Sequence, residues 1–200
     1  MNESTLSRPL GALALALLLL LGGCGMRATE TPPLAGATMG GPFTLTDQNG
    51  RRVSDSAFAG KYRLVYFGYT FCPDVCPLDM QMVGAGLRRF EASDPARAAR
   101  VQPIFITVDP VRDTPDILRR FVAAFHPRLI GLTGSEAEIA RVAREYRIFY
   151  ERAAPGPDGS YMVNHSRMVV LYGPDGKPMA MIPDDRGPEG VAAELEHWVR

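Results

Sequence analysis

The stretch Phe71-Cys72-Pro73-Asp74-Val75-Cys76-Pro77 places two thiols four residues apart at the end of an apolar run. The apolar residues 64–69 predict a buried strand before it, and residues 78–90 predict a helix after it. A residue before proline disfavours helical dihedrals, so we expect both cysteines to lie outside the regular helix, with Cys76 as N-cap and Pro77 at the first position. The unpaired N–H groups and the positive dipole end of the helix then favour the thiolate form of both cysteines.

Composition limits what such a pair can belong to. The 200 residues suit one domain plus a leader, and Lys+Arg and Asp+Glu are equal at 22 each, so no net charge favours nucleic acid as a partner. Three cysteines are too few for a disulfide-stapled scaffold. The only histidines are His126, His165 and His197, so a metal site has few candidate ligands.

The N-terminus has the pattern of an export signal. Residues 10–21 form an unbroken apolar stretch that is short for a membrane span, and small residues precede Cys24 as in a bacterial lipobox. We therefore predict a lipoprotein signal peptide over residues 1–23, acylation of Cys24, and a lipid-anchored protein on the periplasmic side of the bacterial cell envelope. An ordinary signal peptide with a chance cysteine is the alternative. Residues 24–42, rich in Gly, Pro, Thr and Ala, predict a flexible tether.

Strands and helices alternate from residue 43 onward. Residues 43–46 and 51–53 flank an Asn49-Gly50 turn and predict a hairpin. Further strands are expected at residues 61–69, 101–108, 148–152, 168–172 and 178–182, and helices at residues 116–125, 135–146 and 188–199. A cysteine pair at a strand-to-helix junction is typical of thioredoxin-like proteins. We predict an α/β, thioredoxin-like domain over residues 43–200, with a central mixed sheet flanked by helices and an N-terminal hairpin addition.

Three kinds of chemistry fit the cysteine pair, and the residues alone leave all three open. Soft thiolates select Cu(I) or Zn, and metal–sulfur bonds of about 2.3 Å place two sulfurs roughly 3.8 Å apart. Thiol–disulfide exchange between Cys72 and Cys76 needs the sulfurs to close to about 2.05 Å, which the spacing does not forbid. A structural disulfide is the third reading.

A third ligand would favour metal over the other readings. His165, in Asn164-His165-Ser166, directly precedes the strand at residues 168–172 and can project towards the cysteine loop. A lone histidine there is more often a hydrogen-bonded surface or core residue. The remaining candidates have structural interpretations as core, surface, turn or capping residues: His126, His197, Met80, Met82, Asp74 and Asp109.

Residues 66–77, 107–115 and 163–166, in this order and spacing, resemble the Sco/SenC family. The resemblance implies a thioredoxin-like fold and one copper ion, Cu(I) or Cu(II), bound through Cys72, Cys76 and His165. It also implies a role in metallating the binuclear copper site of cytochrome c oxidase subunit II. One departure is Asn164, where many family members carry Asp.

The resemblance thus implies a membrane-tethered copper chaperone without catalytic turnover. Its expected partners are cytochrome c oxidase subunit II and a thiol reductant or another periplasmic copper chaperone. Oxidation of Cys72 and Cys76 to a disulfide would remove two ligands and release the metal. The alternative is a thiol–disulfide oxidoreductase that reduces the cysteines of a partner protein.

Overall fold

A computed structural model of the chain describes residues 30–200, and its folded unit runs from Pro32 to Arg200. The predicted signal peptide and the predicted acylation of Cys24 lie outside the described residues and stay predictions. Within residues 30–200, none of the helices has the length and apolar character that a membrane span requires.

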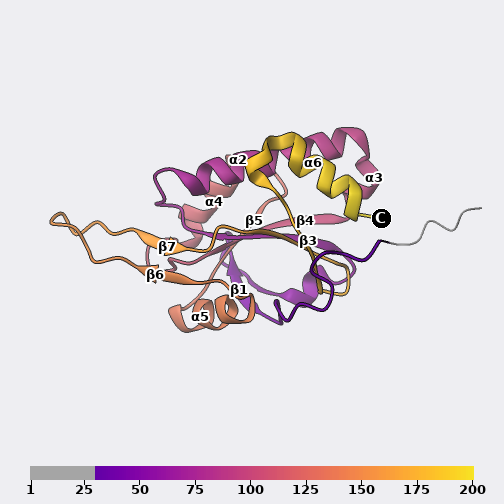
Figure 1. Cartoon of the computed structure of the whole chain (residues 1–200). Helices are drawn as coiled ribbons and strands as arrows, with labels where there is room; N and C mark the ends of the chain where they lie inside the picture. The colour runs from indigo at the N-terminus through magenta and orange to yellow at the C-terminus, as the bar shows by residue number, and fades with distance from the viewer. Residues whose placement is uncertain (1–29) are drawn as a thin grey trace, which may run out of the picture. The chain divides into compact units, whose positions relative to one another are not determined.

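A seven-stranded mixed sheet forms the centre of the unit, in the order β2-β1-β5-β4-β3-β8-β9 (Figure 1). Its strands are β1 (Thr44–Asp47), β2 (Arg52–Ser54), β3 (Tyr62–Gly68), β4 (Val101–Thr107), β5 (Ile130–Thr133), β8 (Val169–Tyr172) and β9 (Pro178–Met181). The strands β3, β4 and β5 are parallel, and the other pairs are antiparallel. The mixed sheet and the hairpin added at its edge are both confirmed.

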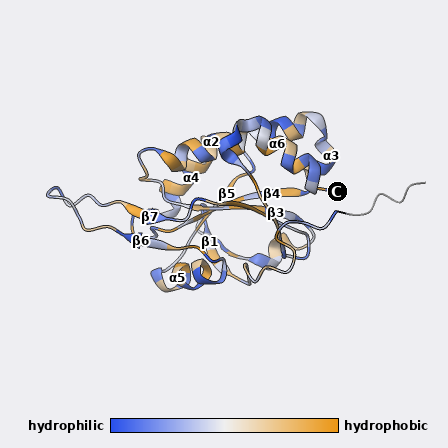
Figure 2. Ribbon diagram, in the orientation of Figure 1, coloured by the Kyte–Doolittle hydropathy of each residue, from blue (hydrophilic) through white to orange (hydrophobic). Residues whose placement is uncertain are grey.

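Helices cover both faces of this sheet. The α-helices are α2 (Val75–Ser93), α3 (Pro95–Ala98), α4 (Pro115–Ala123), α5 (Glu136–Glu145) and α6 (Gly187–Trp198), with short 3-10 helices η1 (Asp55–Phe58) and η2 (Asp184–Arg186). Figure 1 shows α2 and α6 on one side and α5 on the other. All seven residues of β3 are buried because the strand is covered on both faces, and Figure 2 shows the central strands β3, β4 and β5 largely in the orange of hydrophobic residues.

Sequence signals at helix starts proved accurate for two helices. The Thr114 hydroxyl accepts from the backbone N–H of Ile117 at the start of α4. Ser135 and Glu138 form the two hydrogen bonds of a capping box at the start of α5.

The start of α2 differs from the prediction. The helix begins at Val75 with Asp74 as N-cap, so Cys76 lies inside the first turn and is not the N-cap. A proline in the first turn costs no hydrogen bond, because N–H groups there have no intrahelical acceptor. The backbone N–H of Cys76 instead donates to Cys72 Sγ, at 3.4 Å.

Part of the predicted tether is docked on the folded unit. The backbone N–H of Leu34 donates to the carbonyl of Met179, at 2.9 Å, and that of Gly40 donates to the carbonyl of Glu145, at 2.8 Å. The prediction of a flexible tether up to residue 42 is therefore wrong for this stretch. The Gly/Pro composition suggested flexibility, but these contacts are made by backbone groups and leave no side-chain pattern in the sequence.

A second, two-stranded sheet projects beside the main one. The strand β6 (Tyr150–Arg152) pairs antiparallel with β7 (Val163–His165), and Tyr150 lies opposite His165. The hairpin and its loop reach well beyond the sheet in Figure 1. The pattern predicted β6, but no strand was predicted at residues 163–165.

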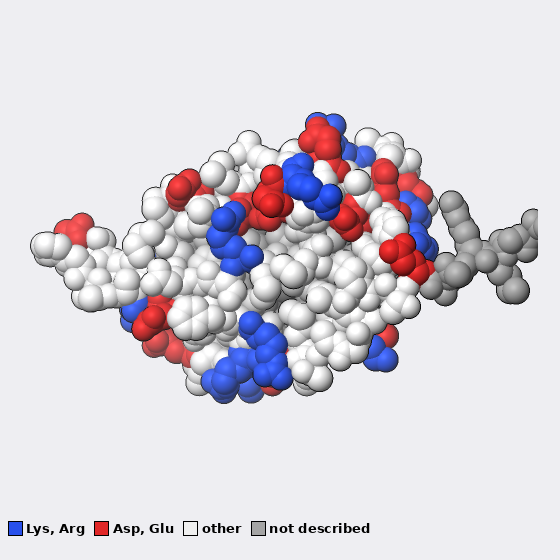
Figure 3. Space-filling model, in the orientation of Figure 1, with Lys and Arg blue, Asp and Glu red and all other residues white. Residues whose placement is uncertain are grey.

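Charged side chains of both signs lie over the helices α2 and α6 in the view of Figure 3. This distribution agrees with the equal totals of 22 basic and 22 acidic residues in the chain.

Candidate metal centre

Three elements bring the predicted ligands together. Cys72 lies on the loop between β3 and α2, Cys76 in the first turn of α2, and His165 at the end of β7. The Sγ atom of Cys76 is 3.3 Å from Nε2 of His165, although the two residues are 89 positions apart. Cys72 Sγ in turn contacts the Cys76 backbone nitrogen, at 3.4 Å. A thiol pair from an early turn and an imidazole from a late strand thus share one site.

The histidine presents the nitrogen that a metal needs. His165 Nδ1 lies 3.0 Å from the backbone carbonyl oxygen of Ser166, which can only accept, so the proton is assigned to Nδ1. Nε2 then carries the free lone pair and faces Cys76, whose thiol donates to it. A hydrogen bond from the other ring nitrogen to a carbonyl is the arrangement that orients histidine ligands in metal sites.

Two buried tyrosines hold the imidazole from the side. The His165 ring is 6.2 Å from the Tyr66 ring and 5.9 Å from the Tyr69 ring, with interplanar angles of 89° and 87°. Such edge-to-face contacts are favourable and restrict the tilt of the ring. Both tyrosines come from the strand that leads into the cysteine loop, and we did not predict their role.

The thiol and the imidazole are both uncharged at neutral pH. Burial raises the pKa of the Cys76 thiol to about 12, and nearby Cys72 adds to this rise, which a hydrogen bond from the Tyr69 backbone opposes. Burial lowers the pKa of His165, against the opposing effect of the Ser166 carbonyl. The prediction that the helix start favours the thiolate is wrong for Cys76, because loss of solvation outweighs the helix dipole there.

The two thiols and the imidazole fit a soft metal ion, but they are not arranged as a complete coordination site. Within residues 30–200, no group of three or more His, Cys, Asp or Glu side chains is arranged to hold a metal ion as it stands. A metal ion would have to replace the thiol proton between Cys76 and His165 and draw in Cys72 Sγ. Two sulfurs and one imidazole nitrogen are the ligand types that copper prefers.

A buried carboxylate holds the beginning of the cysteine loop. Asp113 accepts from the backbone N–H and the hydroxyl of Thr70, at 3.0 and 2.6 Å, and from the hydroxyl of Thr107, at 2.6 Å. Burial raises the pKa of Asp113, and these hydrogen bonds oppose the shift. The segment before Cys72 is therefore tied to the end of β4.

A second buried carboxylate anchors the β6–β7 hairpin. Asp109 is 1% exposed and accepts from the Tyr161 hydroxyl at 2.9 Å. Arg112 pairs with the same carboxylate and lies over the Tyr161 ring, 3.7 Å from its centre. Asp109 is thus a structural residue, as expected, and it anchors the hairpin that ends in His165.

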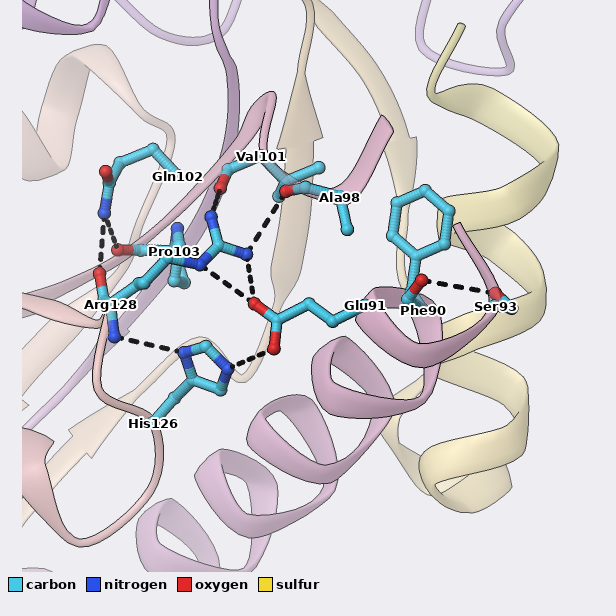
Figure 4. A network of polar contacts seen from close by, with 9 residues as sticks. All are labelled: Phe90, Glu91, Ser93, Ala98, Val101, Gln102, Pro103, His126 and Arg128. Atoms are coloured by element: carbon cyan, nitrogen blue, oxygen red, sulfur yellow. Dashed lines mark hydrogen bonds and ion pairs between the residues drawn. The ribbon is translucent and has the colours of Figure 1, made fainter. Parts of the chain in front are cut away.

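The other candidates have structural roles. Met80 is 1% exposed and belongs to the core, and Asp74 is exposed at the N-cap of α2. His126 binds Glu91, at 3.2 Å, in a network with Arg128 at the far end of α2 (Figure 4). His197 contacts the ring of Trp198.

These observations define a thioredoxin-like protein with a Cys-x-x-x-Cys pair at the strand-to-helix junction and a distal histidine against it. The chain belongs to the SCO1/SenC family, whose family model matches residues 31–200.

Curated relatives agree with this assignment. The chain is 44% identical to a protein from Bos taurus named protein SCO2 homolog, mitochondrial, over 76% of this chain and 57% of that protein. It is 35% identical to the Homo sapiens protein SCO1 homolog, mitochondrial, over 81% of this chain and 53% of that protein. The chain therefore spans about half the length of these relatives.

Solved structures show the same fold. The copper-bound ScoI of Bradyrhizobium japonicum is 41% identical, with a TM-score of 0.72 over 80% of this chain and 99% of that chain. The copper-bound Sco1 of yeast is 30% identical, with a TM-score of 0.73 over 81% of this chain and 88% of that chain. A further structure, of BsSco, is described as a member of the Sco family of cytochrome c oxidase assembly proteins, at 27% identity, with a TM-score of 0.61 over 80% of this chain and 92% of that chain.

The relatives correct the predicted location. Those from Bos taurus, Arabidopsis thaliana, Homo sapiens and Saccharomyces cerevisiae are mitochondrial proteins. The prediction of a lipid-anchored protein on the periplasmic side of a bacterial cell envelope is therefore wrong. That prediction depended on a short apolar run and one cysteine. Both belong to a pattern typical of processing signals and lie outside the folded unit.

Proposed function

We propose that this chain binds one copper ion through Cys72, Cys76 and His165, and helps deliver it to the binuclear copper site of cytochrome c oxidase subunit II. The observation that carries the proposal is the 3.3 Å approach of His165 Nε2 to Cys76 Sγ. Copper-bound structures of relatives at 41% and 30% identity support it.

The ligand set suits a protein that passes its ion on. Two thiolates and one imidazole give a three-coordinate site for Cu(I), and the same atoms take Cu(II) when one more ligand is added. Because the site is not saturated, an incoming ligand from the acceptor can bind before the first one leaves. Cys72 is 8% exposed and Cys76 is 0% exposed, so Cys72 is the ligand nearer to solvent.

Loading also needs a reductant. A disulfide between Cys72 and Cys76 would remove two of the three ligands, so copper binds only the reduced pair. A thiol reductant or a second copper chaperone is therefore the further partner of this site.

Copper titration of the reduced full chain tests the proposal. Competition with a coloured Cu(I) chelator should give one ion per chain for the wild type. His165→Ala should lose more than the about 10–100-fold in affinity that changes around a ligand typically cost. His197→Ala, at an exposed histidine in α6, is the matched control and should keep the wild-type affinity. Wild-type affinity in His165→Ala would exclude the three-ligand site.

Thiol–disulfide exchange is a second candidate function. It is favoured by two free cysteines close together on a thioredoxin-like fold, with Cys72 Sγ 3.4 Å from the Cys76 backbone nitrogen. This activity would reduce the cysteines of a partner protein. It predicts that reduction of a model protein disulfide survives His165→Ala and is lost in Cys72→Ser.

A further inference from the structure

One buried carboxylate lies between the helix that carries Cys76 and the segment that carries His165. Asp79 of α2 is 3% exposed. Arg167 binds it through two parallel hydrogen bonds, with Nε 3.0 Å from Oδ2 and Nη2 against Oδ1. The Tyr66 hydroxyl donates to Oδ2 as well, at 2.7 Å. A carboxylate that accepts three hydrogen bonds from two different elements is held in one orientation.

The sequence positions of this pair connect it to the candidate ligands. Asp79 follows Cys76 by three residues, so both lie on one face of α2, one turn apart. Arg167 follows His165 by two residues, where the chain passes from β7 to β8. Tyr66, the third partner, also packs its ring against the imidazole of His165, at 6.2 Å.

We propose that Asp79 and Arg167 are positioning residues for copper binding: their ion pair holds His165 Nε2 within bonding reach of an ion on Cys76. The inference rests on the proposed function, because it assigns a role in the same site. Neither residue would touch the ion. They would act through the placement of His165.

The local architecture explains why such a tie is needed. His165 ends a two-stranded hairpin, and an isolated two-stranded hairpin is only marginally stable. Just before β7, the connecting loop of the hairpin is anchored by the hydrogen bond from Tyr161 to Asp109. After β7, the Arg167–Asp79 pair ties the chain to α2 beside the contact between His165 and Cys76. A bidentate guanidinium–carboxylate pair fixes direction as well as distance, which a lysine would not.

Substitution of the exposed partner is the first test. The Arg167 side chain is 50% exposed, so Arg167→Gln removes the bidentate guanidinium contact to Asp79 without leaving a cavity in the core. We expect copper affinity to fall about 10–100-fold, the usual effect of losing a residue that orients a ligand. A shifted thiolate-to-Cu(II) absorption band should accompany the loss. Because this variant leaves the buried Asp79 without its cationic partner, Asp79→Asn/Arg167→Gln is the second variant, and it should show the same loss.

A matched control separates positioning from general stability. Arg52 pairs with Glu138 at 2.6 Å, and its side chain is 51% exposed, but the pair joins β2 to α5 and includes no candidate ligand. Arg52→Gln should leave copper affinity and the absorption band unchanged. An equal loss in Arg52→Gln would overturn the proposal.

A double-mutant cycle decides whether the pair acts through His165. In a His165→Ala background, Arg167→Gln should cause no further loss of copper affinity, because the residue it positions is gone. The same fold loss in both backgrounds, or wild-type affinity in Arg167→Gln, would overturn the positioning role and leave the proposed function standing. Wild-type affinity in His165→Ala alone would overturn the proposed function and this inference with it.

Discussion

A β-carbon on Gly68 would lie 3.3 Å from Sγ of Cys76, so the last residue of β3 packs directly against the thiol in the first turn of α2. The same atom would lie 2.7 Å from the Tyr66 ring and 3.1 Å from the Phe105 ring. Glycine is needed at this position for close approach, because any larger residue would displace either an aromatic ring or the sulfur.

Gly68→Ala should therefore weaken both the fold and copper binding. Overpacking of a dense core costs about 1–3 kcal/mol, and the displaced group here includes a candidate ligand. Urea unfolding and chelator competition measure the two effects. Gly41→Ala is the control, since its β-carbon would meet the flexible end of Glu145 at 3.0 Å. Unchanged copper affinity in a destabilised Gly68→Ala would show that Cys76 keeps its place.

The departure at Asn164 has a structural explanation that yields a second prediction. Asn164 lies opposite Glu151 in the β6–β7 register, and side chains alternate along a strand, so it points away from the face of His165. Asn164→Asp would place two carboxylates opposite each other, which costs about 0.2–1 kcal/mol. We expect faster amide exchange in the hairpin and a smaller change in copper affinity than in His165→Ala. A larger change than in His165→Ala would place this side chain at the metal.

Signals confined to a few neighbouring residues were readable in the sequence. The Asn49-Gly50 turn and the Ser135–Glu138 capping box each depend on residues within one turn of the chain, and both are present. The cysteine pair was equally local. His165 was assigned to the site through the resemblance to the Sco/SenC family, because nothing in its sequence neighbourhood indicates a partner 89 positions away.

Properties that depend on distant neighbours were not readable. Arg167 and Asp79 are 88 positions apart, and only the folded sheet brings them together. The pKa of Cys76 followed from burial, which the helix-start argument did not include. A proline after each cysteine suggested a break in the helix, but the first turn of α2 tolerates Pro77 without loss of a hydrogen bond.

The anchor between Tyr161 and Asp109 gives a third prediction. Tyr161→Phe removes the hydroxyl that donates to Asp109, a bond of the charge-assisted kind worth about 1.5–3 kcal/mol, and leaves the ring under Arg112. The loop at residues 153–162 should then open more often, and limited proteolysis there should become faster than in the wild type. An unchanged cleavage rate would mean that the stacked Arg112 holds the hairpin without the hydroxyl.

The network at the far end of α2 makes stability depend on pH. Burial lowers the pKa of His126, only partly offset by Glu91. The Arg128 backbone N–H donates to His126 Nδ1, so the neutral ring donates its Nε2 proton to Glu91. Burial alone would raise the pKa of Glu91, but hydrogen bonds from Arg128 and His126 outweigh it and the pKa is lowered.

Both shifts destabilise the fold in acid, in two separate ranges. The folded pKa of His126 lies below the ordinary value of about 6.5, so the unfolded chain binds more protons and stability falls as the pH drops from there. Glu91 contributes stability above about pH 4.5, and this is lost as the pH falls through its lowered folded pKa. His126→Gln should remove the first fall and keep the second. Urea midpoints measured from about pH 7.5 to about pH 2.5 test this, with His197→Gln as control. An undiminished fall below pH 6.5 in His126→Gln would assign that fall to another group.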